Sequence, residues 1–311
     1  MLYFLYVHFY WARSKPENIV QKKKKISPKK ISPLRYPGGK GSLGPWLGQV
    51  LEFNNITQGC YVEPFAGGAG AALYLLLSEQ VDHIVLNDAD PAIHALWHSI
   101  IFETSEFLKK MRSTEVTIPS WNIQKNIIQN PKQYSSLDLG FAAFFLNRTN
   151  VSGIIKGGVI GGKNQQGKYK IDARFNKTTL EKRIVKISQH RSQITLFNLD
   201  TLDLLKNHVQ ILPNNTILYL DPPYYVKGSQ LYRNFYKHQD HVNLSQQILQ
   251  LEIPWLVSYD NCSQIKEIYK NCPNEEFSLR YSASQNKRTI ATEIIFHNNV
   301  KLPSKPQLVK T

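Results

Sequence analysis

The chain has 311 residues, 42% of them hydrophobic, which excludes a disordered chain and suffices for one large domain or for one domain with a second inserted in it. Its 38 Lys and Arg against 23 Asp and Glu give a formal net charge of +15, which indicates a polyanionic partner, nucleic acid first and acidic membrane surfaces second. Three cysteines without a C-x-x-C pair, and histidines without ligand spacing, exclude a disulfide or zinc framework, so we expect no metal and a reducing, cytoplasmic location.

Positive charge is concentrated in two segments. Residues 13–30 contain eight basic residues and one acidic residue, and residues 148–191 contain eleven basic residues and two acidic ones. The chain begins with an aromatic-rich run that is shorter than the ~20 residues of a transmembrane helix and lacks the basic start of a secretory signal. We therefore predict that residues 1–31 are an N-terminal extension outside the core and not a membrane anchor.

Short apolar runs rich in β-branched and aromatic residues predict the strands, and helical patterns lie between some of them. The predicted strands are 60–65, 83–88, 194–200, 216–223 and 255–260, and the helices between them include 70–80 and 241–252. This alternation predicts an α/β fold with a doubly wound, Rossmann-like parallel sheet. Two later runs, 277–281 and 292–298, predict a terminal antiparallel hairpin.

The pattern changes between residues 91 and 177. Helical periodicity comes first, at 92–102 and 139–147, and is followed by the glycine-rich, basic stretch SGIIKGGVIGGKNQQGKYK. We predict an inserted, mainly helical domain at 91–177 that ends in a mobile, positively charged loop or hairpin. Residues 32–90 and 178–302 then form one discontinuous domain, and residues 303–311 form a tail.

The first motif that could form a binding or catalytic site is YVEPFAGGAGAAL, at 61–73. A strand runs into a glycine-rich turn and then a helix, which lets a ligand approach the backbone at the helix N-terminus. Asp88 ends the next predicted strand, where an acid commonly binds a nucleoside ribose. These features fit a nicotinamide, a flavin or S-adenosylmethionine, and also a purely structural turn. GGVIGGKN, at 157–164, resembles a phosphate loop, but Asn164 replaces the magnesium-binding Ser or Thr, so we expect contact with a phosphate backbone instead.

The second motif is LYLDPPYYV, at 218–226. Consecutive prolines fix the backbone and remove two N–H donors, which leaves Asp221 and the carbonyl of Pro222 as acceptors at the carboxyl edge of the sheet. Two rigid acceptors beside the ring of Tyr224 suit a planar amine, because the acceptors bind its two hydrogens while the ring stacks on the base. The alternative is an ordinary proline turn with core tyrosines.

LDPPY at 220–224, preceded by YVEPFAGGAG, resembles the Dam-type DNA adenine-N6 methyltransferases. In that family the methyl-donor motif comes first, a target-recognition domain follows, and D-P-P-Y comes later, as it does here. The similarity extends over residues 32–300 through PLRYPGGK (33–40), LNDADP (86–91), FFLNRTNVSGI (144–154), WLVSYDN (255–261) and TEIIFHN (292–298). The resemblance implies methyl transfer from S-adenosylmethionine to N6 of an adenine flipped out of duplex DNA. It makes 91–177 the target-recognition domain and admits a companion restriction endonuclease as a partner.

The resemblance also implies roles for individual residues. The flipped adenine would be held by Asp221, Pro222, Pro223 and Tyr224. The donor would be bound by Tyr36, Lys40, Phe65, Gly67, Gly68, Asp88, Asp200 and Asp221, with Lys40 on its carboxylate, Asp88 on its ribose and Asp200 on its adenine amine. DNA would be contacted by Arg35, Arg148, Ser152, Lys156, Asn286, Lys287 and Arg288.

The segment FFLNRTNVSGI, at 144–154, corresponds to the recognition segment of the family. This recognition segment and the residues just after it depart from the family pattern at three positions. Val151 and Ser152 replace an aromatic residue and an asparagine, and Lys156 replaces an arginine whose planar fork a lysine cannot form. These departures argue against the family's usual GATC target. Competing functions are methylation of RNA adenine or of a protein amide, and DNA binding without catalysis. The basic insert favours duplex DNA, and the intact D-P-P-Y and glycine turn favour catalysis.

Overall fold

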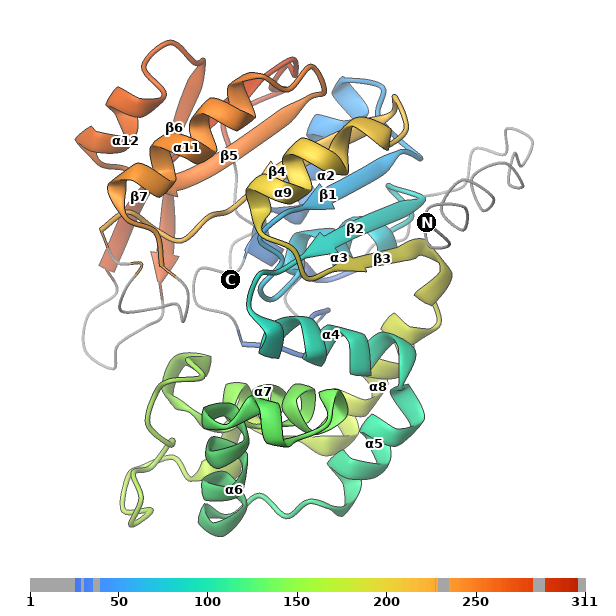
Figure 1. Cartoon of the computed structure of the whole chain (residues 1–311), viewed down its shortest axis with the longest axis vertical. Coiled ribbons are helices and arrows are strands. Elements are labelled where there is room, and N and C mark those ends of the chain that lie inside the picture. Colours follow the sequence, from blue (N-terminus) through green and yellow to red (C-terminus); the bar gives the residue numbers. More distant parts are fainter. Residues whose placement is uncertain are drawn as a thin grey trace.

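The computed structural model describes residues 26–28, 31–35, 40–226, 228, 235–281 and 289–306. Seven strands in these ranges form one sheet in the order β3-β2-β1-β4-β5-β7-β6 (Figure 1). They are β1 (Cys60–Glu63), β2 (His83–Asn87), β3 (Ile194–Phe197), β4 (Thr216–Leu220), β5 (Trp255–Asp260), β6 (Asn274–Tyr281) and β7 (Thr289–Asn298). The first five pair in parallel, and β7 runs antiparallel to both β5 and β6. The predicted doubly wound α/β sheet with a terminal antiparallel hairpin is confirmed.

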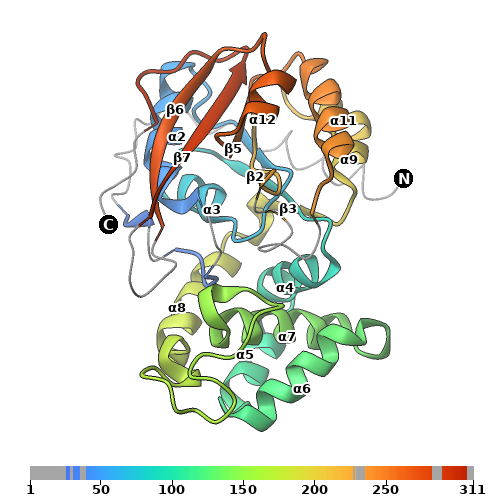
Figure 2. The same ribbon diagram turned by 90° about the vertical axis from the view of Figure 1, so that its left-hand side faces the viewer.

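Alternate side chains of the central strands face two separate apolar cores. On β4, Ile217 and Tyr219 belong to one core, and Leu218 and Leu220 belong to the other. The first face is covered by α2 (Gly44–Phe53) and α3 (Gly70–Leu77), and the second by α9 (Thr201–Asn207), α11 (His238–Leu249) and α12 (Ser263–Ile268) (Figures 1 and 2). Because both faces are buried, the strands appear in the sequence as continuous apolar runs.

A group of helices lies at one end of the molecule, with α4 next to the sheet (Figures 1 and 2). They are α4 (Pro91–Phe102), α5 (Thr104–Ser113), α6 (Ile118–Gln129), α7 (Ser136–Thr149) and α8 (Lys177–Ser188). Phenylalanines fill their interior: the ring of Phe144 lies 5.2 Å from that of Phe107 and 5.5 Å from that of Phe175, both edge-on. Helix α8 packs against α4 and α5, so this helical part continues to Ser188, past the predicted boundary at residue 177.

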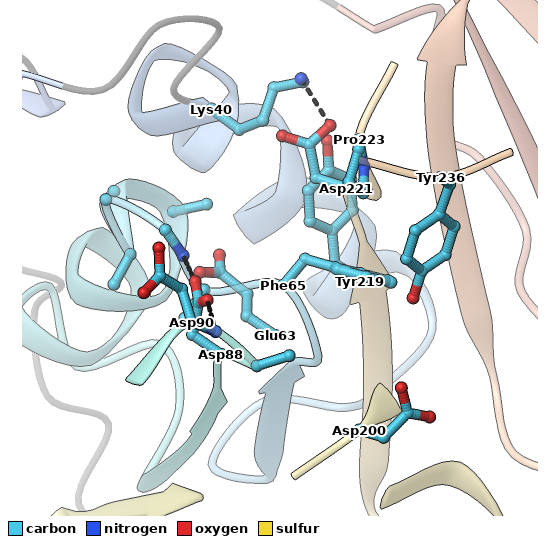
Figure 3. A pocket seen from close by; sticks show the side chains of 17 residues that line it. Lys40, Glu63, Phe65, Asp88, Asp90, Asp200, Tyr219, Asp221, Pro223 and Tyr236 are labelled. Atoms are coloured by element: carbon cyan, nitrogen blue, oxygen red, sulfur yellow. Dashed lines mark hydrogen bonds and ion pairs between the residues drawn. The ribbon is translucent and has the colours of Figure 1, made fainter. Parts of the chain in front are cut away.

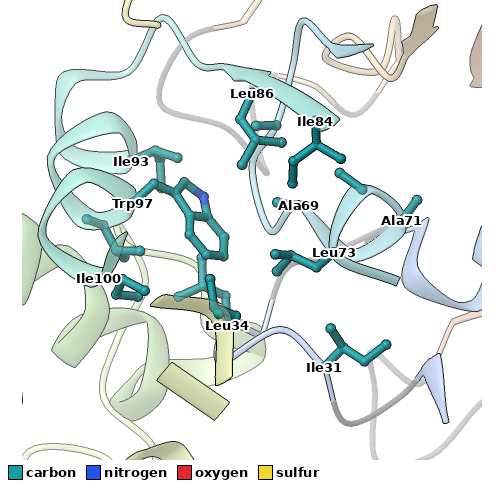
Figure 4. Close-up of a cluster of buried hydrophobic side chains, with 14 of the residues drawn as sticks. Ile31, Leu34, Ala69, Ala71, Leu73, Ile84, Leu86, Ile93, Trp97 and Ile100 are labelled. Carbon is teal, nitrogen blue, oxygen red and sulfur yellow. The ribbon is translucent and has the colours of Figure 1, made fainter. Parts of the chain in front are cut away.

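One of the two apolar cores runs without a break from the sheet into the helical part. Ile93, Trp97 and Ile100 of α4 lie beside Leu73 of α3 and Leu86 of β2 (Figure 4). Short 3-10 turns complete the described chain: η2 (Lys40–Leu43), η3 (Pro131–Gln133), η4 (Val151–Gly153), η5 (Ile171–Arg174), η6 (Arg191–Gln193) and η7 (Val209–Ile211). No helix in the ranges described is long and apolar enough to cross a membrane.

Some element ends differ from the predicted ones, and capping explains two of them. Helix α11 starts at His238 and not at residue 241, because Asp240 accepts a hydrogen bond from Lys237 N–H (2.8 Å) and so starts the helix earlier. Strand β3 ends at Phe197, and Asp200 instead caps α9 by accepting a bond from Leu202 N–H (2.9 Å). At the start of the body, Ile31 is 7% exposed and belongs to the core, inside the predicted extension.

Candidate active site at the carboxyl edge of the sheet

A cavity of about 290 Å³ lies beyond the carboxyl ends of β1, β2 and β4 (Figure 3). The chain order of the strands reverses between β1 and β4, and open α/β sheets bind their ligands at such a point. Most of the predicted donor and acceptor residues line this cavity: Lys40, Phe65, Gly67, Gly68, Asp88, Asp200, Asp221 and Pro223. Residues as far apart in the sequence as Lys40 and Pro223 therefore converge on one site.

The glycine turn between β1 and α3 forms one wall of the cavity. Gly67 has a φ of 44° and Ala69 a φ of 46°, in the left-handed region, so the turn bends sharply at these two positions. Gly67 N–H donates to Asp88 Oδ2 and Asp90 N–H donates to Asp88 Oδ1, each at 2.9 Å. Burial raises the pKa of the Asp88 carboxyl to about 7. The predicted ribose-binding acid is thus held at the cavity by backbone groups.

Glu63, at the end of β1, is a cavity residue to which the sequence motifs assigned no role. Its Oε1 accepts hydrogen bonds from the Tyr61 hydroxyl (3.1 Å) and from Ala72 N–H (3.0 Å) in the first turn of α3. The N-cap residue of α3, Ala69, has no side-chain acceptor for the N–H groups of the first turn. Glu63 supplies the acceptor instead. Burial raises the pKa of Glu63 to about 8. The only trace in the sequence is an acid at a strand end just before a glycine turn.

Asp221 lies at the opposite wall in a cluster of charged groups. Its Oδ1 accepts a hydrogen bond from Lys40 Nζ (2.7 Å) and another from Ser258 Oγ (2.9 Å). Lys40 Nζ also donates to the Tyr224 hydroxyl (3.2 Å) and lies 3.4 Å from Glu293 Oε2. Burial lowers the pKa of Lys40, but attraction by Asp221 and Glu293 outweighs burial and raises it well above the ordinary lysine value. The resemblance assigns Lys40 to the donor carboxylate, whereas here its ammonium contacts Asp221.

Neighbouring strands fix the D-P-P-Y segment from behind. Ser258 on β5 donates its hydroxyl hydrogen to Asp221 and accepts a hydrogen bond from the Tyr219 hydroxyl at 2.8 Å. Asp260, at the end of β5, accepts hydrogen bonds from Tyr225 N–H (2.8 Å) and Val226 N–H (2.9 Å). The ring of Tyr224 is only 4% exposed. None of the β5 side chains was assigned a role from the sequence, because their contacts depend on strand pairing.

The recognition segment packs against the start of the body. Asn147 Nδ2 donates to the carbonyls of Arg35 and Gly153, each at 2.9 Å, and Asn147 Oδ1 accepts from Arg35 N–H (2.8 Å). Gly153 has a φ of 78°, and a Cβ there would lie 2.0 Å from the Arg35 carbonyl oxygen. Only glycine fits this contact, which joins the predicted motifs at 33–40 and 144–154.

Two of the predicted DNA-contacting arginines belong to an arginine cluster beside this contact. Arg35 donates to the carbonyl of Asn150 (3.0 Å), and Arg183 donates to the carbonyl of Ser32 (3.0 Å). Burial, and then repulsion by Arg35, Arg183 and Arg174, lowers the pKa of Arg148. Guanidinium groups gathered in this way form a site of positive potential that an anion would stabilise.

The other predicted DNA contacts lie at the tip of the recognition segment or outside the described chain. Val151 is 55% exposed, and Ser152, next to it, has a φ of 56°. Lys156 is exposed on the loop that follows. Four predicted site residues, Tyr36, Asn286, Lys287 and Arg288, lie outside the described residues. Among the residues that are described, no three His, Cys, Asp or Glu side chains are arranged to hold a metal ion.

Comparison with known proteins identifies the family. No protein with a curated function matches the chain by sequence. Among solved structures, the chain is similar to a protein from Pyrococcus horikoshii that is described as an RNA methyltransferase. The two share 10% identity over 94% of this chain and 97% of that chain, with a TM-score of 0.41. The chain is also similar to an assigned methylase from Haemophilus influenzae, with 14% identity over 83% of this chain and 87% of that chain and a TM-score of 0.29. Identities and TM-scores this low carry no information about substrate.

The sequence model of one family, by contrast, matches residues 36–287, which include the glycine turn, the D-P-P-Y segment and the helical part. The predicted family is confirmed by this match: the chain belongs to the D12 class of N6 adenine-specific DNA methyltransferases.

Proposed function

We propose that Asp221, Pro222 and Tyr224 hold the N6 amine of an adenine flipped out of duplex DNA, and that S-adenosylmethionine is the methyl donor bound beside it. The observation that carries this proposal is the position of Asp221. Its carboxylate is oriented by Lys40 and Ser258 at the wall of the same cavity that the glycine turn and Asp88 line. An amine held by Asp221 therefore lies next to a ligand held by the glycine turn.

The charge of the cavity supports this donor over a dinucleotide. Besides Glu63, whose raised pKa leaves it mostly protonated at neutral pH, four carboxyl groups line it, from Asp88, Asp90, Asp200 and Asp221, against one ammonium, from Lys40. A pyrophosphate would be repelled by this lining, whereas a ligand with a sulfonium and an ammonium group would be attracted to it. In this proposal Asp88 accepts hydrogen bonds from ribose hydroxyls, and Asp200 accepts one from an adenine amine; both residues line the cavity. The rings of Phe65 and Tyr236, 5.9 Å apart, form an apolar wall.

When bound, S-adenosylmethionine supplies a methyl group whose C–S electron pair leaves with sulfur as the new N–C bond forms. Asp221 and the carbonyl of Pro222 accept the two amine hydrogens, which directs the nitrogen lone pair towards the methyl group. Asp221 also stabilises the positive charge that develops on the amine. Tyr224 stacks on the base and offsets part of the cost of flipping, which is a few kcal/mol. No strong base is needed before attack, because the methylated amine readily loses its proton.

We assign DNA recognition to the helical part, residues 91–188, and its flanking basic residues. Val151 stands exposed at the tip of the recognition segment, and Arg35 and Arg148 lie in the arginine cluster at its base. Contacts between these arginines and phosphates would position the duplex, and base contacts near Val151 and Lys156 would select the target.

Labelled S-adenosylmethionine supplied with duplex DNA, RNA and protein tests this proposal. We expect label in DNA alone, as N6-methyladenine. An Asp221→Ala variant should lose about 100-fold or more in kcat, because it lacks the acceptor for the amine. Asp203→Ala, at an exposed acid of α9, is the matched control and should retain full activity. Label in RNA or protein but not in DNA, or an Asp221→Ala variant as fast as the parent, would refute the proposal.

A further inference from the structure

Glu293 is a buried acid for which the proposed chemistry gives no role. It lies on β7 and is 1% exposed. Strand β7 pairs antiparallel with β5, and this register sets Glu293 opposite Asp260, beside the D-P-P-Y segment. A carboxylate withdrawn from water in this way costs several kcal/mol unless cations and hydrogen-bond donors compensate it.

Two groups that compensate the charge of Glu293 belong to the proposed acceptor site. Tyr224 donates its hydroxyl hydrogen to Glu293 Oε1, and Lys40 Nζ lies 3.4 Å from Glu293 Oε2. Lys40 Nζ in turn contacts Asp221 Oδ1 at 2.7 Å and lies 5.3 Å from the centroid of the Tyr224 ring. Glu293 thus contacts the stacking ring through its hydroxyl, and it contacts the amine acceptor through the ammonium of Lys40.

The charges of this cluster bear on catalysis. With Asp221 alone as its counter-ion, Lys40 would neutralise the carboxylate that must stabilise a developing positive charge. With Glu293 as a second counter-ion, the two carboxylates and one ammonium keep a net negative charge beside the amine. At short range in a site with little water, such a charge difference has a large effect on a cationic transition state.

We propose that Glu293 is a positioning residue for methyl transfer: it holds Lys40 and the Tyr224 hydroxyl, so that the cluster around Asp221 keeps a net negative charge and Tyr224 keeps the ring orientation that the adenine requires. This assignment rests on the proposed function of the D-P-P-Y segment. Glu293 acts through these side chains and does not touch the reacting atoms.

The test is Glu293→Gln, which keeps the size of the side chain and removes its charge. We expect kcat at saturating DNA and donor to fall about tenfold or more, and the donor Kd to stay within about twofold of the parent. Glu276→Gln, the same change at an exposed residue of β6 that pairs with Lys266, is the matched control and should behave like the parent. In a Lys40→Met background the further change Glu293→Gln should cost much less, because Asp221 then has no ammonium to neutralise it.

Several outcomes decide the matter. A Glu293→Gln variant with parental kcat would overturn this assignment alone, and so would an equal loss in the Lys40→Met background. Should Glu293→Gln fail to fold, Glu293→Asp replaces it. Its shorter carboxylate cannot reach both Lys40 and Tyr224, so we expect at least a threefold loss in kcat, and parental kcat would again overturn the assignment. A parent chain that transfers no label to DNA would instead overturn the proposed function and this assignment with it.

Discussion

For Asp88, the sequence predicted the position of the side chain but not its hydrogen bonds or its pKa. The strand-end pattern places an acid after β2, and the structure sets Asp88 at the cavity as predicted. Its environment does not follow from the motif: both carboxylate oxygens accept backbone N–H groups, and burial raises the pKa to about 7. An acid that titrates near neutrality makes ligand binding depend on pH.

We predict that donor affinity rises with pH through about 7, because only the ionised form of Asp88 offers two acceptors to a ribose. If only that form binds, the Kd should be about tenfold weaker at pH 6 than at pH 8. Calorimetric titration of the donor at both pH values measures this difference. Asp88→Asn should abolish it, while Glu63→Gln, which removes the other cavity acid that titrates near this range, should preserve it. An unchanged pH dependence in Asp88→Asn would contradict the prediction.

Residues whose contacts depend on strand pairing could not be predicted. Lys40, Asp221 and Tyr224 could be assigned roles from their motifs. Ser258 reaches Asp221 only because β5 pairs with β4 in one particular register, and Glu293 reaches Lys40 and Tyr224 only because β7 pairs with β5 in one particular register. A shift of either register by one residue would turn the side chain that depends on it to the other face of the sheet. Local sequence does not contain this information.

Among the elements, α3 and η2 meet at a contact that fixes Lys40. A Cβ on Gly70, the first residue of α3, would lie 2.9 Å from both the Cα and the N of Gly41. The backbones of the glycine turn and of η2 therefore touch directly, next to Lys40. The motif at 61–73 predicted a glycine turn for a ligand, but the structure shows that one of its glycines serves helix packing.

Gly70→Ala should therefore destabilise the protein, although alanine is the better helix former by about 1 kcal/mol. Separating two backbones should cost about 1–3 kcal/mol in free energy of unfolding, and displacing Lys40 should weaken the site around Asp221. Urea denaturation and donor titration measure the two effects. Gly158→Ala, where an added Cβ has nothing within 4 Å, is the control for stability. A Gly70→Ala variant more stable than the parent would show that the contact has no such role.

For the whole molecule, the fold class followed from the alternation of strands and helices, and the uneven charge followed from simple counting. The limits of the helical part did not follow from the sequence. Helix α8 could belong to either part, and only its packing against α4 and α5 assigns it to the helical part. The basic residues of the segment 148–191 lie within or beside this part, away from α11 and α12 (Figure 1).

DNA affinity should fall steeply with salt, and the slope should reflect these basic residues. Replacing three exposed lysines of the loop after the recognition segment, Lys163, Lys168 and Lys170, by alanine should reduce the slope of log K against log[NaCl] by about 3. Fluorescence anisotropy with labelled duplex DNA measures it. The same change at Lys266, Lys270 and Lys301, which lie outside the helical part, alters net charge equally and should leave the slope nearly unchanged. Equal effects of the two triple variants would mean that DNA affinity depends on the net charge of the protein and not on where the lysines lie.

The unbroken apolar core limits how the DNA specificity of this protein could change. Trp97 of α4 donates its indole N–H to the carbonyl of Gly67 (2.9 Å), so a helix of the helical part supports the glycine turn itself. Exchanging the whole of 91–177 for another recognition domain would remove that support and leave Leu73 and Leu86 exposed. New specificities should therefore arise by substitution at the outer surface, around Val151 and Lys156, and not by swapping the helical part as a cassette.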